Sequence, residues 1–141
     1  MDNNESLDIN RDLALVRIER AEELIATAKN EFDRGDWKTA NNRAFYAMEK
    51  AAKVVLATKG KSAKSHTGVL KTFNKNFIHE GDGSFDHNDY RDMQEAEMIR
   101  QSSDYDDFYI VKKDDCIRQI KNAEKLVKKA KKYVMSQIES E

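Results

Sequence analysis

The stretch that decides the fold is WKTANNRAFYAMEKAAKVVLA, residues 37–57. At 100° per residue its apolar side chains cover an arc of roughly 200°, about twice the width of the apolar stripe on an ordinary surface helix. We therefore expect a central helix that two or more neighbouring helices cover. The arc consists of Trp37, Ala40, Ala44, Phe45, Ala47, Met48, Ala51, Ala52, Val54, Val55 and Leu56.

The opposite face of this helix is polar and carries one aromatic hydroxyl. Two interpretations are open: a polar site or subunit contact, and a solvated face with a single exposed aromatic ring, which is common in proteins. As a site, the face makes Asn42, Arg43 and Tyr46 candidate ligand-binding residues. Its other members are Glu49, Lys50 and Lys53.

Length and composition predict one all-α domain. The chain has 141 residues, enough for a hydrophobic core of its own, and contains no Pro and five Gly. It is strongly polar, with 36% charged residues and a mean hydropathy of −0.86. Regularly spaced apolar residues nevertheless argue against disorder, since a disordered chain has no reason to space them.

The sequence also predicts the setting of the protein. A lone Cys116 excludes an internal disulfide framework, and no apolar run is long enough to span a bilayer. The N-terminus, MDNNESLDIN, is polar and does not resemble a secretion signal, so we expect a cytoplasmic protein. We expect residues 1–10 to form a polar N-terminal segment and residues 11–139 to form the helical bundle.

Charge is distributed in blocks, although the net charge is only −1. Seven Lys and no acid lie between Glu49 and Glu80, ten acids and two Arg lie in residues 80–107, and nine basic residues and three acids lie in residues 112–132. Such blocks indicate either helices that attract one another or separate anion-binding and acidic surfaces.

Four more helices are predicted around the central one. The first spans about residues 6–34, with Ser6 or Asp8 as its cap, and Gly35 and Asp36 then join it to the central helix as an antiparallel hairpin. A short third helix starts at a Ser65 or Thr67 cap and runs through residue 78. A fourth helix starts at residue 86 or 88, and the last one begins after residue 109.

The last helix carries a basic face beside its core stripe. This face is a candidate phosphate-binding surface, although lysine-rich solvated faces are the norm for terminal helices. Its members are Arg118, Lys121, Lys125, Lys128, Lys129 and Lys132.

A second candidate site lies in IRQSSDYDDF, residues 99–108. If the fourth helix continues through this stretch, Arg100 and Asp104 face each other, with Tyr105 alongside. A guanidinium held by a carboxylate can bind or orient a phosphate, which makes these three the candidate catalytic residues. The alternative is an ion pair that only closes the helix.

The three histidines match no metal pattern, so we expect neither a metal nor a cofactor. His66 stands in the first turn of the third helix, where it could help to hold an anion. The alternative for His66 is a helix-start residue that is hydrogen-bonded locally.

Three stretches in this order carry a family resemblance: NRAFYAMEKAAKVVL (42–56), SHTGVLKTFNKNFI (65–78) and IRQSSDYDDF (99–108). Together they resemble the HEPN domain family, over about residues 12–135. The resemblance implies an up-and-down bundle of four or five helices, commonly a homodimer.

In the ribonucleases of that family, an Arg is followed four to six residues later by a His, and the pair acts at a dimer cleft without metal. Arg100 fits the Arg, but no His follows it, and Asp104 or Tyr105 stands near the expected place. A carboxylate of ordinary pKa is a poor proton donor at neutral pH. The phosphate-binding Arg therefore carries over better than the nuclease activity.

The leading hypothesis is an RNA- or nucleotide-binding protein without efficient nuclease activity. It would belong to a toxin–antitoxin or similar two-component system with a nucleotidyltransferase partner. One alternative is a divergent metal-independent endoribonuclease in which Asp104, Tyr105 or His66 replaces the missing His. Another is a non-catalytic helical interaction module.

Overall fold

The computed structural model describes the backbone of residues 3–139 and the side chains of residues 11–138. Over this range the chain is helical and contains no strand, so the all-α prediction is confirmed. The elements are α1 (Asn3–Asp33), α2 (Trp37–Ala57), α3 (His66–Phe73), the π-helical turn η1 (Asn74–His79), α4 (His87–Tyr105) and α5 (Lys113–Glu139).

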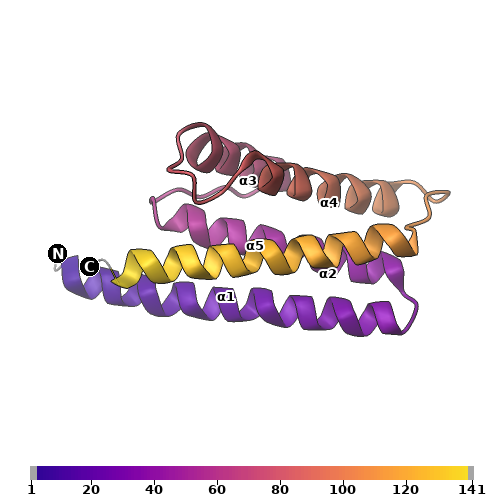
Figure 1. Cartoon of the computed structure of the whole chain (residues 1–141), viewed down its shortest axis with the longest axis horizontal. Helices are drawn as coiled ribbons and strands as arrows, with labels where there is room; N and C mark the ends of the chain where they lie inside the picture. The colour runs from indigo at the N-terminus through magenta and orange to yellow at the C-terminus, as the bar shows by residue number, and fades with distance from the viewer. Residues whose placement is uncertain (1–2, 140–141) are drawn as a thin grey trace.

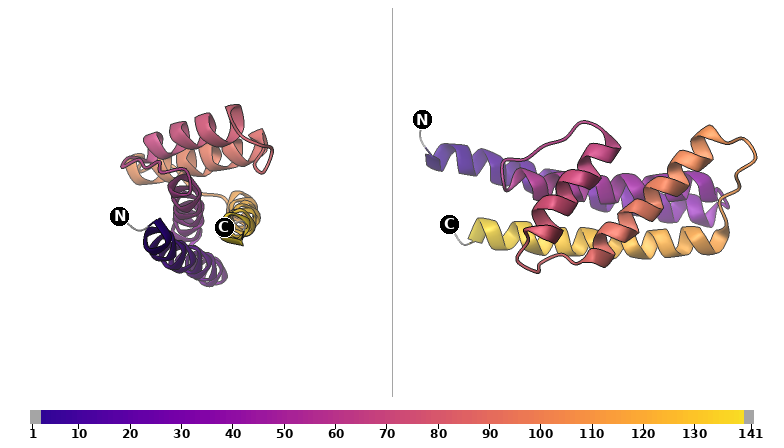
Figure 2. Two further views of the ribbon diagram at one scale, coloured as in Figure 1. Left: turned by 90° about the vertical axis from the view of Figure 1, so that its left-hand side faces the viewer. Right: turned by 90° about the horizontal axis from the view of Figure 1, so that it is seen from above.

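Helix α2 lies at the centre of the bundle, between the pair α1 and α5 on one side and the layer of α3 and α4 on the other (Figures 1 and 2). It contacts all four of these helices. The whole predicted apolar arc is buried except Trp37, which is half-buried. The prediction of a central helix with several neighbours, with bounds at residues 37 and 57, is confirmed.

The α1–α2 hairpin forms as predicted. Gly35 has a φ of +83°, and the amides of Gly35 and Asp36 donate to the carbonyls of Phe32 and Glu31, which closes the end of α1. Asp36 then caps α2, because its side chain accepts a hydrogen bond from the Thr39 amide at 3.1 Å.

The start of α1 differs from the prediction. The helix begins at Asn3, so Ser6 and Asp8 lie inside it and do not mark its start. It also continues without a break across residue 10, where we expected a polar segment to end. The side chains of residues 1–10 lie outside the described residues.

The segment 66–79 is a helix that changes its winding. Ser65 caps α3 by accepting a hydrogen bond from the Gly68 amide, and Val69, Leu70, Phe73 and Phe77 are buried as predicted. The last turn is π-helical, which the periodicity of the sequence does not reveal.

Opposite charges join α4 to α5. Asp89 belongs to the capping box at the start of α4 and is almost fully buried, and Lys129 of α5 lies 2.6 Å from its carboxylate. Lys125 is 3.9 Å from the other carboxylate oxygen, and Arg118 pairs with Glu95. Much of the basic face predicted on the last helix therefore binds acids of α4, as expected for charge blocks that attract one another.

No helix in the described part of the chain combines the length and apolar character that crossing a membrane requires.

Candidate functional site

Polar side chains from three helices meet where α3 and α4 pack on α2. We call this cluster the polar seam. It consists of Asn42, Tyr46 and Glu49 of α2, His66 of α3, and Glu97, Arg100 and Asp104 of α4. Two helices of the same chain thus cover part of the polar face of the central helix: Glu49 is buried and Tyr46 half-buried, whereas Arg43 and Lys53 are exposed.

Arg100 is the fixed cation of the polar seam. It is only 7% exposed, and its guanidinium donates to both carboxylate oxygens of Glu97, at 2.8 and 3.0 Å, and to Asp104 at 2.8 Å. It also lies 5.6 Å from the centre of the Phe45 ring. The hydrogen bonds to Glu97 raise the pKa of Arg100 by more than burial lowers it, so this group stays charged.

The two carboxylates hold Arg100 unequally. Glu97 is the bidentate partner, and its side chain is 14% exposed, whereas Asp104 makes one bond and is 32% exposed. The second oxygen of Asp104 lies 4.0 Å from Lys38 of α2. Among the described residues, these bonds leave two of the five guanidinium N–H donors of Arg100 without a partner.

The imidazole of His66 is held by the carboxylate of Glu49. Its Nδ1 is in close contact with Glu49, a buried residue whose other oxygen lies 3.8 Å from Lys53. The imidazole packs edge-on against Phe45 and lies 6.1 Å from the Tyr46 ring. Its Nε2 has no partner within the described residues, and the side chain is 37% exposed. The partner of His66 is thus 17 residues away, and the local hydrogen bond considered above is not formed.

The structure brings together some of the predicted site residues and separates others. Arg100, Asp104, Tyr46 and His66 belong to one cluster, and Asn42 stands one turn before Tyr46, with a buried Oδ1 that has no partner in the described part of the chain. Tyr105 is 80% exposed and does not lie alongside Arg100, since five residues advance a helix by 140° past a full turn. Arg43 is also exposed, on the rim of α2.

Sequence reasoning missed two partners that organise this cluster. Glu97 was detectable as the residue three before Arg100, a spacing that places both on one helix face. Glu49 was assigned to the polar face of α2, but its contact with His66 depends on how α3 crosses α2, and no local pattern encodes that crossing.

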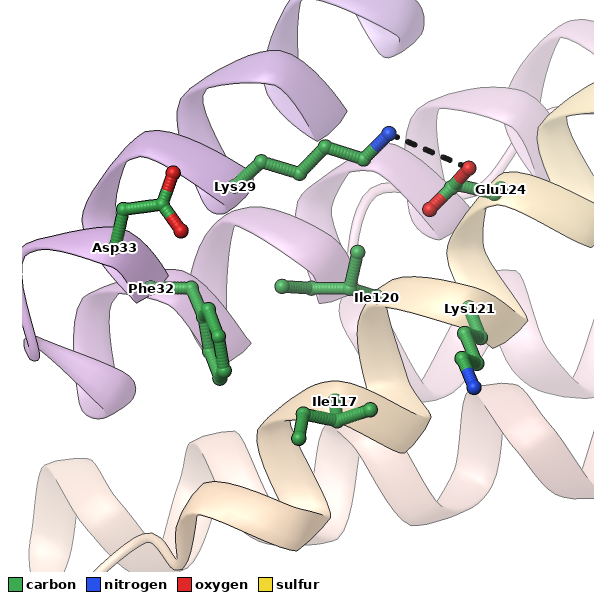
Figure 3. Close-up of a pocket in the computed structure, with 7 residues that line it drawn as sticks. All are labelled: Lys29, Phe32, Asp33, Ile117, Ile120, Lys121 and Glu124. Carbon is green, nitrogen blue, oxygen red and sulfur yellow. Dashed lines mark ion pairs between the residues drawn. The ribbon is translucent and has the colours of Figure 1, made fainter.

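A separate groove lies between α1 and α5 (Figure 3). It has a volume of about 280 Å³ and is lined by Lys29, Phe32, Asp33, Ile117, Ile120, Lys121 and Glu124. None of these residues belongs to the polar seam. Across the residues that the structure describes, no group of three or more His, Cys, Asp or Glu side chains is placed to hold a metal ion.

Comparison with known proteins identifies the family of this chain. The model of the HEPN domain matches residues 14–133. This chain belongs to the HEPN domain family. It is 36% identical over 119 residues to a UPF0332 protein of Archaeoglobus fulgidus, a match that covers 84% of this chain and 93% of the relative.

Two relatives in Methanocaldococcus jannaschii are named "putative toxin". One is 32% identical over 119 residues, covering 84% of this chain and 80% of the relative. The other is 42% identical over 64 residues, covering 45% and 48%. The chain is therefore a HEPN bundle similar to proteins named as toxins, in line with the resemblance found in the sequence.

Proposed function

We propose that this HEPN protein is a toxin-like component that binds RNA or a nucleotide at the polar seam and lacks efficient nuclease activity. The observation that carries the proposal is a permanently charged guanidinium with unused donors next to Phe45, whose ring also contacts the half-buried Tyr46 and His66. Guanidinium groups bind phosphates, and aromatic rings next to them can stack on bases.

The unequal hydrogen bonding of Glu97 and Asp104 to Arg100 indicates how a phosphate would enter. Glu97 fixes the guanidinium with two bonds, whereas Asp104 holds it with one and already lies near Lys38. A phosphate that takes the place of Asp104 would find Arg100 oriented in advance, and Asp104 would turn toward Lys38. Asp104 thus competes with the ligand.

The test is a titration with short single-stranded RNA and with ATP, followed by fluorescence anisotropy at several salt concentrations. Arg100→Gln should weaken binding at least tenfold and reduce the slope of log K against log salt by about one. Asp104→Asn should tighten binding about fivefold, because it removes a negative charge next to the phosphate. Arg91→Gln, in an exposed residue of the same helix, is the matched control and should change little.

Absence of binding by the wild-type protein at low salt would overturn the proposal. So would equal effects of Arg100→Gln and Arg91→Gln. Because Arg100→Gln removes the charged partner of Glu97 and leaves Asp104 only Lys38 at 4.0 Å, thermal unfolding of each variant has to accompany the titration. Asp104→Asn keeps the proposal testable if Arg100→Gln does not fold. Absence of binding, or equal effects of Arg100→Gln and Arg91→Gln, would favour the non-catalytic interaction module.

A second candidate function, divergent metal-independent endoribonuclease, is favoured by the pair His66 and Glu49. Glu49 holds Nδ1 of the imidazole, and Nε2 is left to exchange a proton with a ligand. Nε2 would take the proton of a 2′-hydroxyl as its oxygen attacks the adjacent phosphorus. The P–O5′ bond then breaks, and the leaving 5′-oxygen takes a proton from water, which gives a 2′,3′-cyclic phosphate and a 5′-hydroxyl.

RNA cleavage in EDTA tests this second function. The wild-type protein should give cyclic-phosphate ends, His66→Ala should abolish the activity, and added imidazole should restore part of it. A merely structural His66 would not allow rescue by imidazole. Intact RNA with the wild-type protein, or cleavage that His66→Ala leaves unchanged, would exclude this function without affecting the binding proposal.

We also propose that the protein acts as a homodimer within a toxin–antitoxin pair whose other member is a small nucleotidyltransferase. The names of the relatives support the toxin side of this proposal. Tyr105 is exposed, so its hydroxyl is accessible for nucleotide transfer by such a partner. Co-expression with the neighbouring open reading frame, followed by co-purification and intact-mass analysis of Tyr105→Phe, tests this assignment. A neighbour of unrelated sequence that does not co-purify would contradict it.

A further inference from the structure

Exposed apolar side chains gather at the end of α4 and in the loop that follows it. In the part of the chain whose side chains are described, the large apolar residues exposed to solvent include Met98, Tyr105, Phe108 and Ile110. Only Leu13 and Val16 lie elsewhere. Phe108 is 94% exposed, and such a concentration of exposed apolar surface is typical of a contact site.

The loop presents Phe108 in a defined conformation. The Phe108 amide donates to the Asp106 carboxylate at 2.9 Å, and the Tyr109 amide donates to the Asp106 carbonyl at 3.0 Å. Val111, three residues after Phe108, is buried and anchors the return of the chain to α5. A loop whose backbone is held in this way loses less conformational entropy when its side chains bind.

The groove between α1 and α5 (Figure 3) has an apolar floor that complements the exposed apolar side chains of the loop. The ring of Phe32 and the side chains of Ile117 and Ile120 face one another across it. Its volume is about 280 Å³. At its rim, Lys121 has no partner among the described residues, and Asp107 next to Phe108 has none either.

We propose that Phe108 of one copy occupies the groove between α1 and α5 of a second copy, with Asp107 next to Lys121, and that the exchange is reciprocal. The loop, the end of α1 and the start of α5 all lie at the same end of the bundle, so one two-fold interface can contain both halves of the contact (Figure 1). The proposal rests on the proposed homodimer and specifies its contact, independently of RNA binding.

The charges that stay unpaired argue for a second copy as the occupant. The loop combines apolar side chains with Asp104, Asp106 and Asp107. The groove combines an apolar floor with two cations, Lys29 and Lys121, and two acids, Asp33 and Glu124. Lys29 is 3.4 Å from Glu124, so Lys121 is the cation left to pair with an incoming acid. The same chain therefore carries both halves of the contact.

Cross-linking between differently tagged chains tests the contact directly. In a Cys116→Ala background, Asp107→Cys on one chain and Lys121→Cys on the other keep Phe108 and the groove floor intact. Mild oxidation of the mixture should give a mixed-tag disulfide dimer. Lys128→Cys, in an exposed residue of α5 two turns further on, is the matched control and should cross-link at least tenfold less.

A predominance of 107–107 disulfides, or equal cross-linking at residues 121 and 128, would overturn the proposed contact while leaving the homodimer standing. A monomer in sedimentation velocity at 50 µM, roughly the range of weak complexes, would overturn both. RNA binding is measured separately, so its failure would not affect this result.

Truncation of the aromatic anchor supplies a second measurement. Phe108→Ser should weaken dimerisation at least tenfold, because buried aromatic anchors dominate interface energies. Met98→Ser, which also removes an exposed apolar side chain, should weaken it less than about threefold. Both sites are exposed, so helical content should not change, and a dimer unaffected by Phe108→Ser would contradict the proposal.

Discussion

At the scale of single residues, the polar seam depends on which carboxylate holds Arg100. Glu95 and Glu97 are neighbours on α4 and both pair with an Arg, but the Arg118 partner of Glu95 is about half exposed, whereas the Arg100 partner of Glu97 is buried. Exposed pairs contribute little to stability, whereas breaking a buried pair leaves an uncompensated charge. The two positions therefore form a matched comparison.

We predict that Glu97→Gln lowers the free energy of unfolding by about 2 kcal/mol, because Asp104 alone then compensates the buried guanidinium. Glu95→Gln should lower it by less than about 1 kcal/mol. Urea denaturation of both variants measures the difference. Equal losses would show that Arg100 is not the electrostatic centre of the seam.

Cys116 gives a prediction about pH. Burial raises the pKa of its thiol to about 11. The folded state then holds the proton more tightly than the unfolded state, in which the thiol has its ordinary pKa of about 9.0. The stabilisation is complete below the unfolded pKa and is lost as pH rises from about 9 towards 11. The loss in the free energy of unfolding is about 1 kcal/mol at pH 10.

Denaturation at pH 8 and pH 10 should therefore show that Cys116→Ala loses about 1 kcal/mol less stability over this interval than the wild-type protein. In native buffer at pH 8, the wild-type thiol should also react with a thiol reagent only as fast as the protein unfolds. Rapid reaction of the folded protein would mean that Cys116 is not buried in solution.

At the scale of helices, local sequence patterns predict the helix ends and which helix lies at the centre of the bundle. The width of the apolar arc predicts that α2 has several neighbours, and Gly35 and Asp36 mark the helix ends that the structure has. Of the paired cap candidates, Ser65 and Asp86 are the caps of α3 and α4. The π-helical turn at 74–79 and the buried Phe85 were not predicted, since both depend on tertiary packing around the aromatic cluster of Phe73, Phe77 and Tyr133.

In the candidate site, the sequence predicts contacts within one helix but not contacts between helices. The pair Arg100 and Asp104 lies within one helix, so its spacing alone predicted the ion pair. The contacts of His66 with Glu49 and of Arg100 with Phe45 join different helices. These contacts depend on how α3 and α4 cross α2, which side-chain periodicity does not specify.

Gly35 supplies the prediction for the hairpin. Its φ of +83° lies in the left-handed region, and nothing within 4 Å would meet an added Cβ, so the cost of substitution is conformational. Gly35→Ala should lower the free energy of unfolding by about 1 kcal/mol, and Gly35→Asn by less, since Asn tolerates this region better. Thermal unfolding should rank them in that order, and an Ala variant as stable as the wild type would show that the hairpin tolerates another turn.

At the scale of the whole molecule, α2 separates two surfaces with different properties. The layer of α3 and α4 lies on one side of α2, and the pair α1 and α5 lies on the other (Figure 2). The polar seam lies where α3 and α4 pack on α2, and the groove lies between α1 and α5. Much of the α5 basic face pairs with acids of α4, which leaves Lys121, Lys128 and Lys132 without ion pairs among the described residues. These lysines are the competing surface for an anionic ligand.

The most direct test of the central claim is to locate the bound RNA on the protein. Photocross-linking to RNA that contains 4-thiouridine, followed by peptide mass spectrometry, identifies the residues that bases contact. We predict cross-links in the peptides that contain Tyr46 and His66, and their loss when Arg100 is changed to Gln. Cross-links confined to residues 121–132 of α5, unchanged by that substitution, would contradict the account.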